Sequence, residues 1–185
     1  MEKKDALVTA SYLTTEEDYI HFRLAVHKGK LNRTEVSILR VVGFLMVIGG
    51  GVGSLLAGGG SFLKSLSWML LVLLGLIAAF YSDYIEPYVL KLQGKNEYPV
   101  MKNRLVAQTI FFYEERMHVS TDRYEAELPY DLLYACAEDG KVFLFYTGME
   151  EVRFVPKRAM SPAECESLRT LLRKKMGDRY LELKG

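Results

Sequence analysis

The stretch VVGFLMVIGGGVGSLLAGGGSFLKSLSWMLLVLLGLIAAFYS, residues Val41–Ser82, decides how this chain is built. It contains one charged residue, Lys64, and the glycines at 58–60 divide it into two nearly equal halves. Each half approaches the roughly 20 apolar residues that a helix needs to cross about 30 Å of hydrocarbon. We therefore expect a two-helix transmembrane hairpin within residues 35–84, with helices at about 36–57 and 62–82.

The charged residues around this stretch predict its orientation. Lys64 in the middle of a span would cost roughly 2.5–3.5 kcal/mol, whereas near a turn at Gly58–Ser61 its long side chain reaches the membrane surface. Basic residues lie just outside both outer ends of the hairpin, and such residues favour the cytoplasmic side. They are Lys28, Lys30, Arg33 and Arg40 on one side, and Lys91, Lys95, Lys102 and Arg104 on the other. We expect a multi-pass protein of the cell membrane with both termini in the cytoplasm.

The first of the two expected helices is rich in glycine. Gly49 and Gly53 form a G-x-x-x-G pair, and Ala57 extends the same face. Small residues let two helix backbones approach closely, which promotes helix packing inside lipid. We interpret this face as packing on the second helix of the hairpin; contact with a protein partner or a homodimer is the alternative.

The segments on either side of the hairpin have different patterns. Residues 1–34 predict a cytoplasmic strand at Ala6–Tyr12 and a helix at about 16–27, capped by Thr14 or Thr15. Whether this strand joins a sheet elsewhere in the chain stays open. Residues 85–104 predict a juxtamembrane helix and linker, in which the helix begins near Pro87 and ends at Gly94.

Residues 105–185 predict a β-rich domain with one amphipathic helix at its end. Six short runs of β-branched and aromatic residues predict strands at 109–113, 117–120, 124–128, 134–137, 141–146 and 152–155. Ser161, Pro162 and Glu164 have the spacing of a capping box that begins a helix. The sequence thus indicates an α+β fold: a cytoplasmic antiparallel sheet or partial barrel capped by a C-terminal helix, in outline a pleckstrin-homology-like (PH-like) domain.

Four short motifs, taken in order, resemble the YcxB-like family of small bacterial membrane proteins over nearly the whole chain. They are TTEEDYIHF at 14–22, FYEERM at 112–117, LPYD at 128–131 and VPKRAM at 155–160. Tyr130 and Met160 stand where the family pattern would have tryptophan and phenylalanine, and both keep a bulky apolar side chain. The resemblance implies no established activity and no catalytic residues.

No motif in the chain indicates catalysis. The histidines His21, His27 and His118 lack metal-ligand spacing, and Cys136 and Cys165 form no C-x-x-C motif. The 24 basic and 23 acidic residues nearly balance, which gives nucleic-acid binding no support. We expect no enzyme, no cofactor and no metal.

Lys157 and Arg158 are the candidate contacts for an anion or a partner. They follow a predicted strand and precede the capped helix, whose N-terminus favours negative charge. An ordinary basic turn is the alternative interpretation of this pair.

These patterns predict a non-catalytic, membrane-anchored cytoplasmic module that recognises a protein or lipid partner at the inner membrane surface. The alternative is an accessory subunit of a membrane transport or secretion assembly, or a self-protection (immunity-type) protein.

Overall fold

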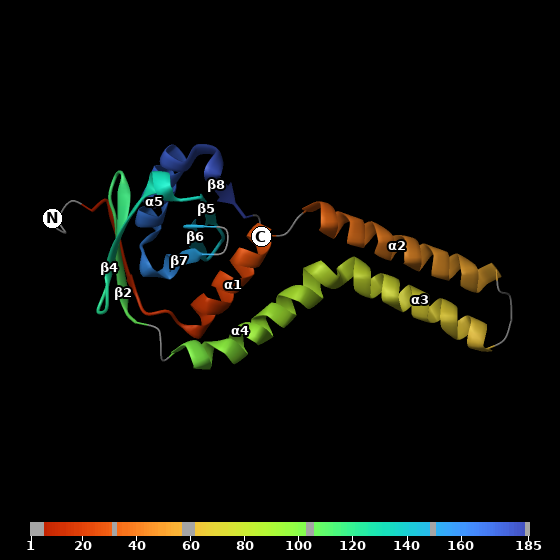
Figure 1. Ribbon diagram of the computed structural model, residues 1–185. Coiled ribbons are helices and arrows are strands. Elements are labelled where there is room, and N and C mark those ends of the chain that lie inside the picture. Colours follow the sequence, from red (N-terminus) through yellow and green to blue (C-terminus); the bar gives the residue numbers. More distant parts are fainter. Residues whose placement is uncertain (1–5, 31–32, 57–61, 103–105, 149–150, 184–185) are drawn as a thin grey trace. The chain divides into compact units, whose positions relative to one another are not determined.

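The computed structural model describes residues 6–30, 33–56, 62–102, 106–148 and 151–183, which form two compact units (Figure 1). One unit combines residues 1–29 with residues 91–185, and the other contains residues 30–90. The fold is α+β, as the sequence predicts. The segments before and after the apolar stretch therefore fold together into one unit, called here the α+β unit.

The two segments meet in a β-ladder. Strand β1 (Val8–Tyr12) pairs antiparallel with β2 (Gln108–Phe112), so that Tyr12 lies opposite Gln108. The alternation of apolar and polar residues in β1 buries Val8, Ala10 and Tyr12 on one face. The N-terminal strand thus joins the sheet, and the four helices α1 to α4 all lie in the connection between two neighbouring strands.

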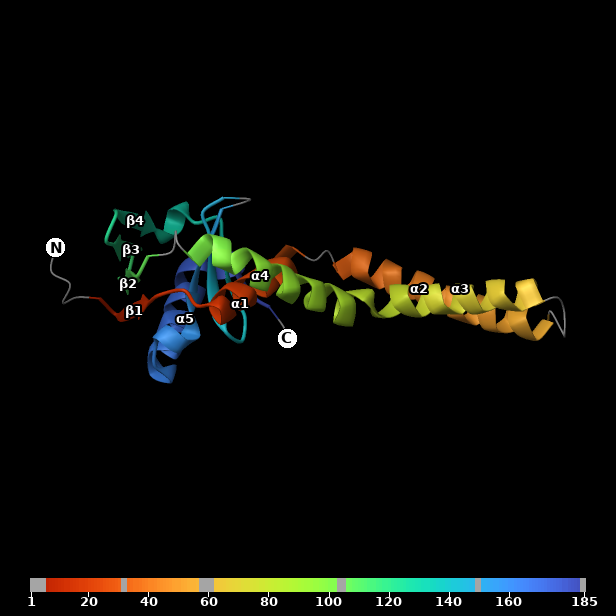
Figure 2. The same ribbon diagram turned by 90° about the horizontal axis from the view of Figure 1, so that it is seen from below.

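Two four-stranded sheets build the α+β unit. The first has the order β1-β2-β3-β4, with β3 at Arg116–Thr121 and β4 at Glu125–Pro129 (Figure 2). The second has the order β7-β6-β5-β8, with β5 at Ala135–Glu138, β6 at Val142–Tyr146, β7 at Val152–Pro156 and β8 at Tyr180–Glu182. The expectation of a purely antiparallel sheet is wrong at one place, because β8 pairs parallel with β5.

Helix α5 (Pro162–Met176) packs with both sheets around a shared core. Its predicted capping box is confirmed, since the Ser161 hydroxyl accepts from the Glu164 amide and the Glu164 carboxylate accepts from the Ser161 amide. Leu168 and Leu172 of the helix are fully buried together with Phe112, Phe143 and Phe145. Burying side chains of this size stabilises a fold by roughly 1.5–3 kcal/mol each.

Helix α1 (Glu16–Lys30) covers the opposite face of the second sheet. Ala25 packs against Val142 and Leu144, and the Phe22 ring stacks on Phe154 with 4.6 Å between centroids. Helices α1 and α5 thus lie on either side of β5, β6 and β7 (Figure 1). Strand β6 is therefore buried on both faces, which explains its continuous apolar sequence VFLFY.

Helix α4 spans Glu86–Lys102, so the prediction that Gly94 ends it is wrong. Gly94 is buried, and a Cβ placed on it would lie 3.1 Å from the Cγ1 atom of Ile20 in α1. Glycine therefore serves close helix packing here and not helix termination. The Tyr98 hydroxyl also donates to the Thr14 carbonyl at 3.0 Å, which joins α4 to the start of α1.

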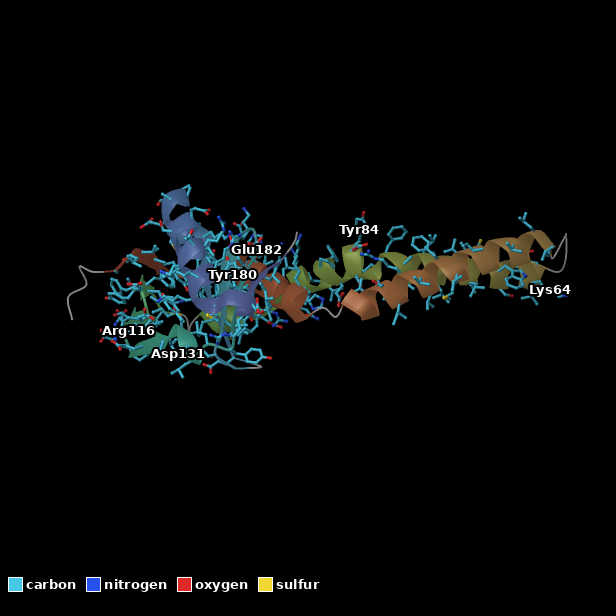
Figure 3. All side chains as sticks on the ribbon, turned by 90° about the horizontal axis from the view of Figure 1, so that it is seen from above. Lys64, Tyr84, Arg116, Asp131, Tyr180 and Glu182 are labelled. Carbon is cyan, nitrogen blue, oxygen red and sulfur yellow. The ribbon has the colours of Figure 1, made fainter. Side chains whose placement is uncertain are left out.

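The second unit contains α2 (Arg33–Leu56), α3 (Phe62–Phe80) and a π-helical turn at Tyr81–Ile85 that leads into α4. Two helical segments, Val36–Leu56 and Phe62–Lys102, are long and apolar enough to cross a membrane. Figure 3 shows Lys64 and Tyr84 near opposite ends of α3. The expected turn at Gly58–Ser61 lies outside the described residues.

Candidate functional site

The candidate residues Lys157 and Arg158 lie in the single 3-10 turn Lys157–Ala159 that joins β7 to α5. A 3-10 turn has about three residues per turn, so the side chains of two neighbouring residues point in different directions. Each of them meets a different buried carboxylate, Glu138 or Asp18.

Arg158 binds Asp18, which lies in the first turn of α1. Its Nε donates to Oδ1 at 2.8 Å and its Nη2 to Oδ2 at 2.5 Å, and Nη2 also donates to the Leu13 carbonyl at 2.9 Å. Asp18 is only 5% exposed. Burial raises the pKa of Asp18, but the hydrogen bonds from Arg158 and from Thr15 outweigh that effect and lower it below the usual value.

Asp18 also completes the N-terminus of α1. The Thr15 amide donates to the Asp18 carboxylate at 2.8 Å, and the Asp18 amide donates to the Thr15 hydroxyl at 3.3 Å. This reciprocal pair is a capping box with Thr15 as the N-cap, so the choice that the sequence left between Thr14 and Thr15 falls on Thr15. One carboxylate thus caps the helix and fastens it to the turn before α5.

Lys157 belongs to a second cluster, which we call the Glu138 cluster: Glu138, Lys157, Arg169 and Tyr180. Lys157 Nζ lies 2.5 Å from Glu138 Oε1, Arg169 Nε lies 2.8 Å from Oε2, and the Tyr180 hydroxyl donates to Oε2. Glu138 is 7% exposed. Burial raises its pKa, but the donors of Arg169, Lys157 and Tyr180 more than compensate and lower it to about 2.

Both predicted contact residues therefore have internal carboxylate partners, which the sequence did not reveal. In the sequence, Glu138 ends an apolar run just before Asp139-Gly140. Asp18 is one of the acidic residues that commonly begin a helix. A charged residue at the end of an otherwise apolar strand is the one signal in the sequence by which Glu138 could have been found. Lys157 and Arg158 stay candidates for partner contact, with both charges already balanced within the chain.

Two clefts border these ion pairs. One, of about 300 Å³, lies beside the Glu138 cluster and includes Arg173 and Glu182 in its lining; the other, of about 330 Å³, is lined by Asp18, His21, Lys141 and Arg158, among others. Both linings mix acidic and basic side chains. In the described part of the chain no group of three or more His, Cys, Asp or Glu side chains could hold a metal ion.

The two cysteines are buried free thiols. Burial raises the pKa of Cys136 to about 12 and also raises that of Cys165. A thiol in this state is a poor nucleophile at neutral pH. Both side chains belong to the core shared by the two sheets and α5.

Only part of the glycine face predicted on α2 contacts α3. A Cβ on Gly49 would meet nothing within 4 Å, whereas a Cβ on Gly53 would lie 2.6 Å from the Trp68 ring of α3. Gly43 and Gly50 complete the face that contacts α3, and Ala57 lies outside the described residues. Positions seven apart, such as 43 and 50, share a helix face more closely than positions four apart.

The fold and these two ion-pair clusters define an α+β unit whose first two strands are connected through a pair of long apolar helices. Comparison with protein families matches residues 112–172 to the model described as YcxB-like protein. The match runs from the end of β2 into α5, and it confirms the resemblance for this part of the chain. No curated protein and no solved structure gives a significant match.

Proposed function

We propose that this chain is a non-catalytic, membrane-anchored binding module whose cytoplasmic PH-like domain recognises a protein or lipid partner at the inner membrane surface. The observation that supports it most directly is the position of α2 and α3 in the connection between β1 and β2. Because these strands pair residue by residue, both must lie on the same side of any membrane that the helices cross. The basic residues outside the helices favour the cytoplasm for that side.

The arrangement of the strands supports the PH-like part of the proposal. One sheet is built from β1 to β4, the other contains β5 to β7, and α5 packs with both around one core. Such a domain offers strand edges and a terminal helix, which are common recognition surfaces.

The electrostatics support a binding role and not a catalytic one. A general acid or base works best with a pKa near the working pH, whereas Glu138 has a pKa of about 2 and Asp18 one below its usual value. Cys136, with a pKa of about 12, is no better placed as a nucleophile. In the part of the chain that is described, the buried ionised groups hold elements together.

The placement is tested by labelling introduced cysteines in intact cells with a membrane-impermeant maleimide. Lys64 and Ser167 are exposed, whereas the native cysteines are buried. We expect Lys64→Cys to react from outside, and Ser167→Cys to react only after the cells are permeabilised. Reaction of Ser167→Cys in intact cells would overturn the cytoplasmic placement of the domain.

One observation favours the alternative of an accessory subunit. Gly49 and Gly51 of α2 leave open space beside them, and the neighbouring Ile48 is exposed, so this face is free of α3. A photo-crosslinking residue placed at Ile48, or at Thr170 or Leu132 of the α+β unit, distinguishes the accessory subunit from the binding module in cells. Crosslinks from the α+β unit support the binding module, whereas crosslinks from Ile48 alone would favour the accessory subunit.

A further inference from the structure

Strand β8 differs from every other described strand. It is three residues long, and it runs parallel to β5 with Cys136 opposite Tyr180 and Glu138 opposite Glu182. It follows α5 after the turn Gly177–Arg179, where Gly177 has a φ of 54°, a conformation that suits glycine. Strand β8 therefore covers an edge of β5 that would otherwise be open to another chain.

A short ladder to β5, core packing by Tyr180 and Leu183, and a small set of polar contacts hold β8 in place. The Leu183 amide donates to the Glu138 carbonyl at 2.8 Å, the Tyr180 hydroxyl reaches the Glu138 carboxylate, and Glu182 pairs with Arg173 of α5. Leu181 is 46% exposed, and both side chains of the Glu182–Arg173 pair are about half exposed. A three-residue strand whose central Leu181 and whose ion pair are about half exposed is in the low-stability part of a fold.

The side chains of β8 show which chemistry this edge accepts. Successive residues of a strand point to opposite faces, so Tyr180 and Glu182 share a face, and both meet Arg173 of α5. Arg173 contacts both, since its guanidinium carbon lies 5.9 Å from the centre of the Tyr180 ring. An aromatic hydroxyl and a carboxylate two positions apart thus fit Glu138 and Arg173 at once.

We propose that the edge of β5 and the adjoining side of α5 form a peptide-binding groove that β8 fills in the free protein. The partner is an extended protein segment with a tyrosine followed two residues later by an acidic residue, and it takes the place of β8. Backbone hydrogen bonds to β5 supply binding, and Glu138 and Arg173 supply selectivity. This inference rests on the proposed function and names the surface that would serve it.

The first test measures binding of a fluorescent peptide, DRYLEL, to the full chain by anisotropy. Glu182→Lys removes the ion pair of β8 with Arg173, which weakens the binding of β8 to the groove and leaves the groove itself intact. We expect this variant to bind the peptide at least about tenfold more tightly than the unmodified chain, because β8 competes less well. Glu127→Lys, the same charge change on the exposed side of β4, is the matched control and leaves the affinity unchanged. Equal affinities in all three proteins would overturn the proposal.

A charge exchange tests selectivity. In Arg173→Glu, we expect the peptide DRYLEL to bind at least about tenfold more weakly than DRYLKL, which carries lysine at the acidic position. This reversal depends on the pairing itself, so a general loosening of the fold does not produce it. Equal binding of the two peptides to this variant overturns the assignment of Arg173.

A measurement on the unmodified chain does not depend on any variant folding. Saturating peptide is expected to speed hydrogen exchange at the Leu183 amide while the amides of β6 stay protected. Unchanged exchange at Leu183 counts against displacement of β8. A dimer of Glu182→Lys that peptide does not dissociate would make a second copy of the chain the occupant and overturn the partner assignment.

Failure of the groove and failure of the proposed function give different results. If no peptide binds but photo-crosslinks still form from Thr170 or Leu132, the groove is wrong and the binding module stands. If crosslinks form only from Ile48, the proposed function itself fails.

Discussion

Glu138 illustrates how a buried charge positions elements in this chain. Moving a carboxylate out of water is costly, and here donors from three elements compensate that cost: Lys157 before α5, Arg169 within α5 and Tyr180 in β8. Removing one partner of such a cluster costs more than the cluster contributes, because the remaining charges stay buried. The cluster therefore specifies where α5 and β8 lie on β5.

The low pKa of Glu138 predicts a pH-dependent contribution to stability. The pKa falls from an ordinary 4.5 to about 2 on folding, so the ionised carboxylate stabilises the fold above pH 4.5, and this contribution is lost as the pH falls toward about 2. The difference corresponds to about 3 kcal/mol. We expect Glu138→Gln to be less stable by about that amount at pH 7, and the gap to narrow between pH 4.5 and 2, as measured by urea unfolding. A difference in unfolding free energy that does not change with pH would contradict this prediction. Glu127→Gln, at an exposed position, is the control.

The Asp18–Arg158 pair predicts a strong coupling between α1 and the turn before α5. Replacing Arg158 with alanine leaves the buried Asp18 carboxylate without its main partner, which we expect to cost about 1–3 kcal/mol of unfolding free energy. Arg158→Lys should recover only part of this loss, because lysine cannot donate from two nitrogens in a fixed fork. Denaturant unfolding of both variants, with exposed Arg123→Ala as a control, measures the effect. A loss in Arg158→Ala no larger than that in Arg123→Ala would show that the pair holds nothing together.

The packing of α2 on α3 depends on two glycines that face each other. A Cβ on Gly43 would lie 2.6 Å from the Ala79 amide nitrogen, and a Cβ on Gly75 would lie 2.6 Å from the Gly43 carbonyl. Backbone atoms cannot move aside as a flexible side chain can. The two helices therefore approach most closely where the sequence has no side chain, which is the usual device for helix pairs in lipid.

This contact predicts opposite results for two chemically identical substitutions. Gly43→Leu should force α2 away from α3 and lower the melting temperature of the helix pair in detergent, followed by circular dichroism. Gly51→Leu should leave it nearly unchanged, because a Cβ there meets nothing within 4 Å. Equal losses in the two variants would mean that helix propensity, and not the close contact, sets the stability of the pair.

Local patterns predicted most individual elements, and long-range contacts account for the failures. Strand boundaries shift by one or two residues at most, and Ser161 and Glu164 cap α5 as expected, because such signals lie within a few residues. The prediction that Gly94 ends its helix was wrong, because the side chain that Gly94 accommodates belongs to Ile20, far away in the sequence. Strand β8 was not predicted, because three residues are too few to show a periodicity. The partners of Lys157 and Arg158 were not predicted, because ion pairs between distant segments leave no local pattern.

The insertion of α2 and α3 between two paired strands has a consequence for the whole chain. Strand β1 contributes Val8, Ala10 and Tyr12 to the same core as α5, and α1 covers the second sheet. Residues 91–185 therefore form a complete domain only together with residues 1–29. Folding of the α+β unit therefore depends on the path of the apolar helices, because the chain that enters them must return to complete the β1–β2 ladder.

This dependence predicts which fragment folds. Helices α1 and α4 pack with Ile20 beside Gly94, and Tyr19 and Arg23 of α1 both bind Glu97, so a Gly/Ser linker of about eight residues easily spans the distance from Gly29 to Lys91. A chain in which this linker replaces residues 30–90 keeps both sheets, α1 and α5, and we expect it to be monomeric and to unfold cooperatively. Residues 91–185 alone lack β1 and α1, which uncovers the edge of β2 and one face of the second sheet, and we expect this fragment to aggregate. Size-exclusion chromatography and thermal unfolding compare the two; a fragment 91–185 as stable and monomeric as the joined chain would show that β1 is dispensable.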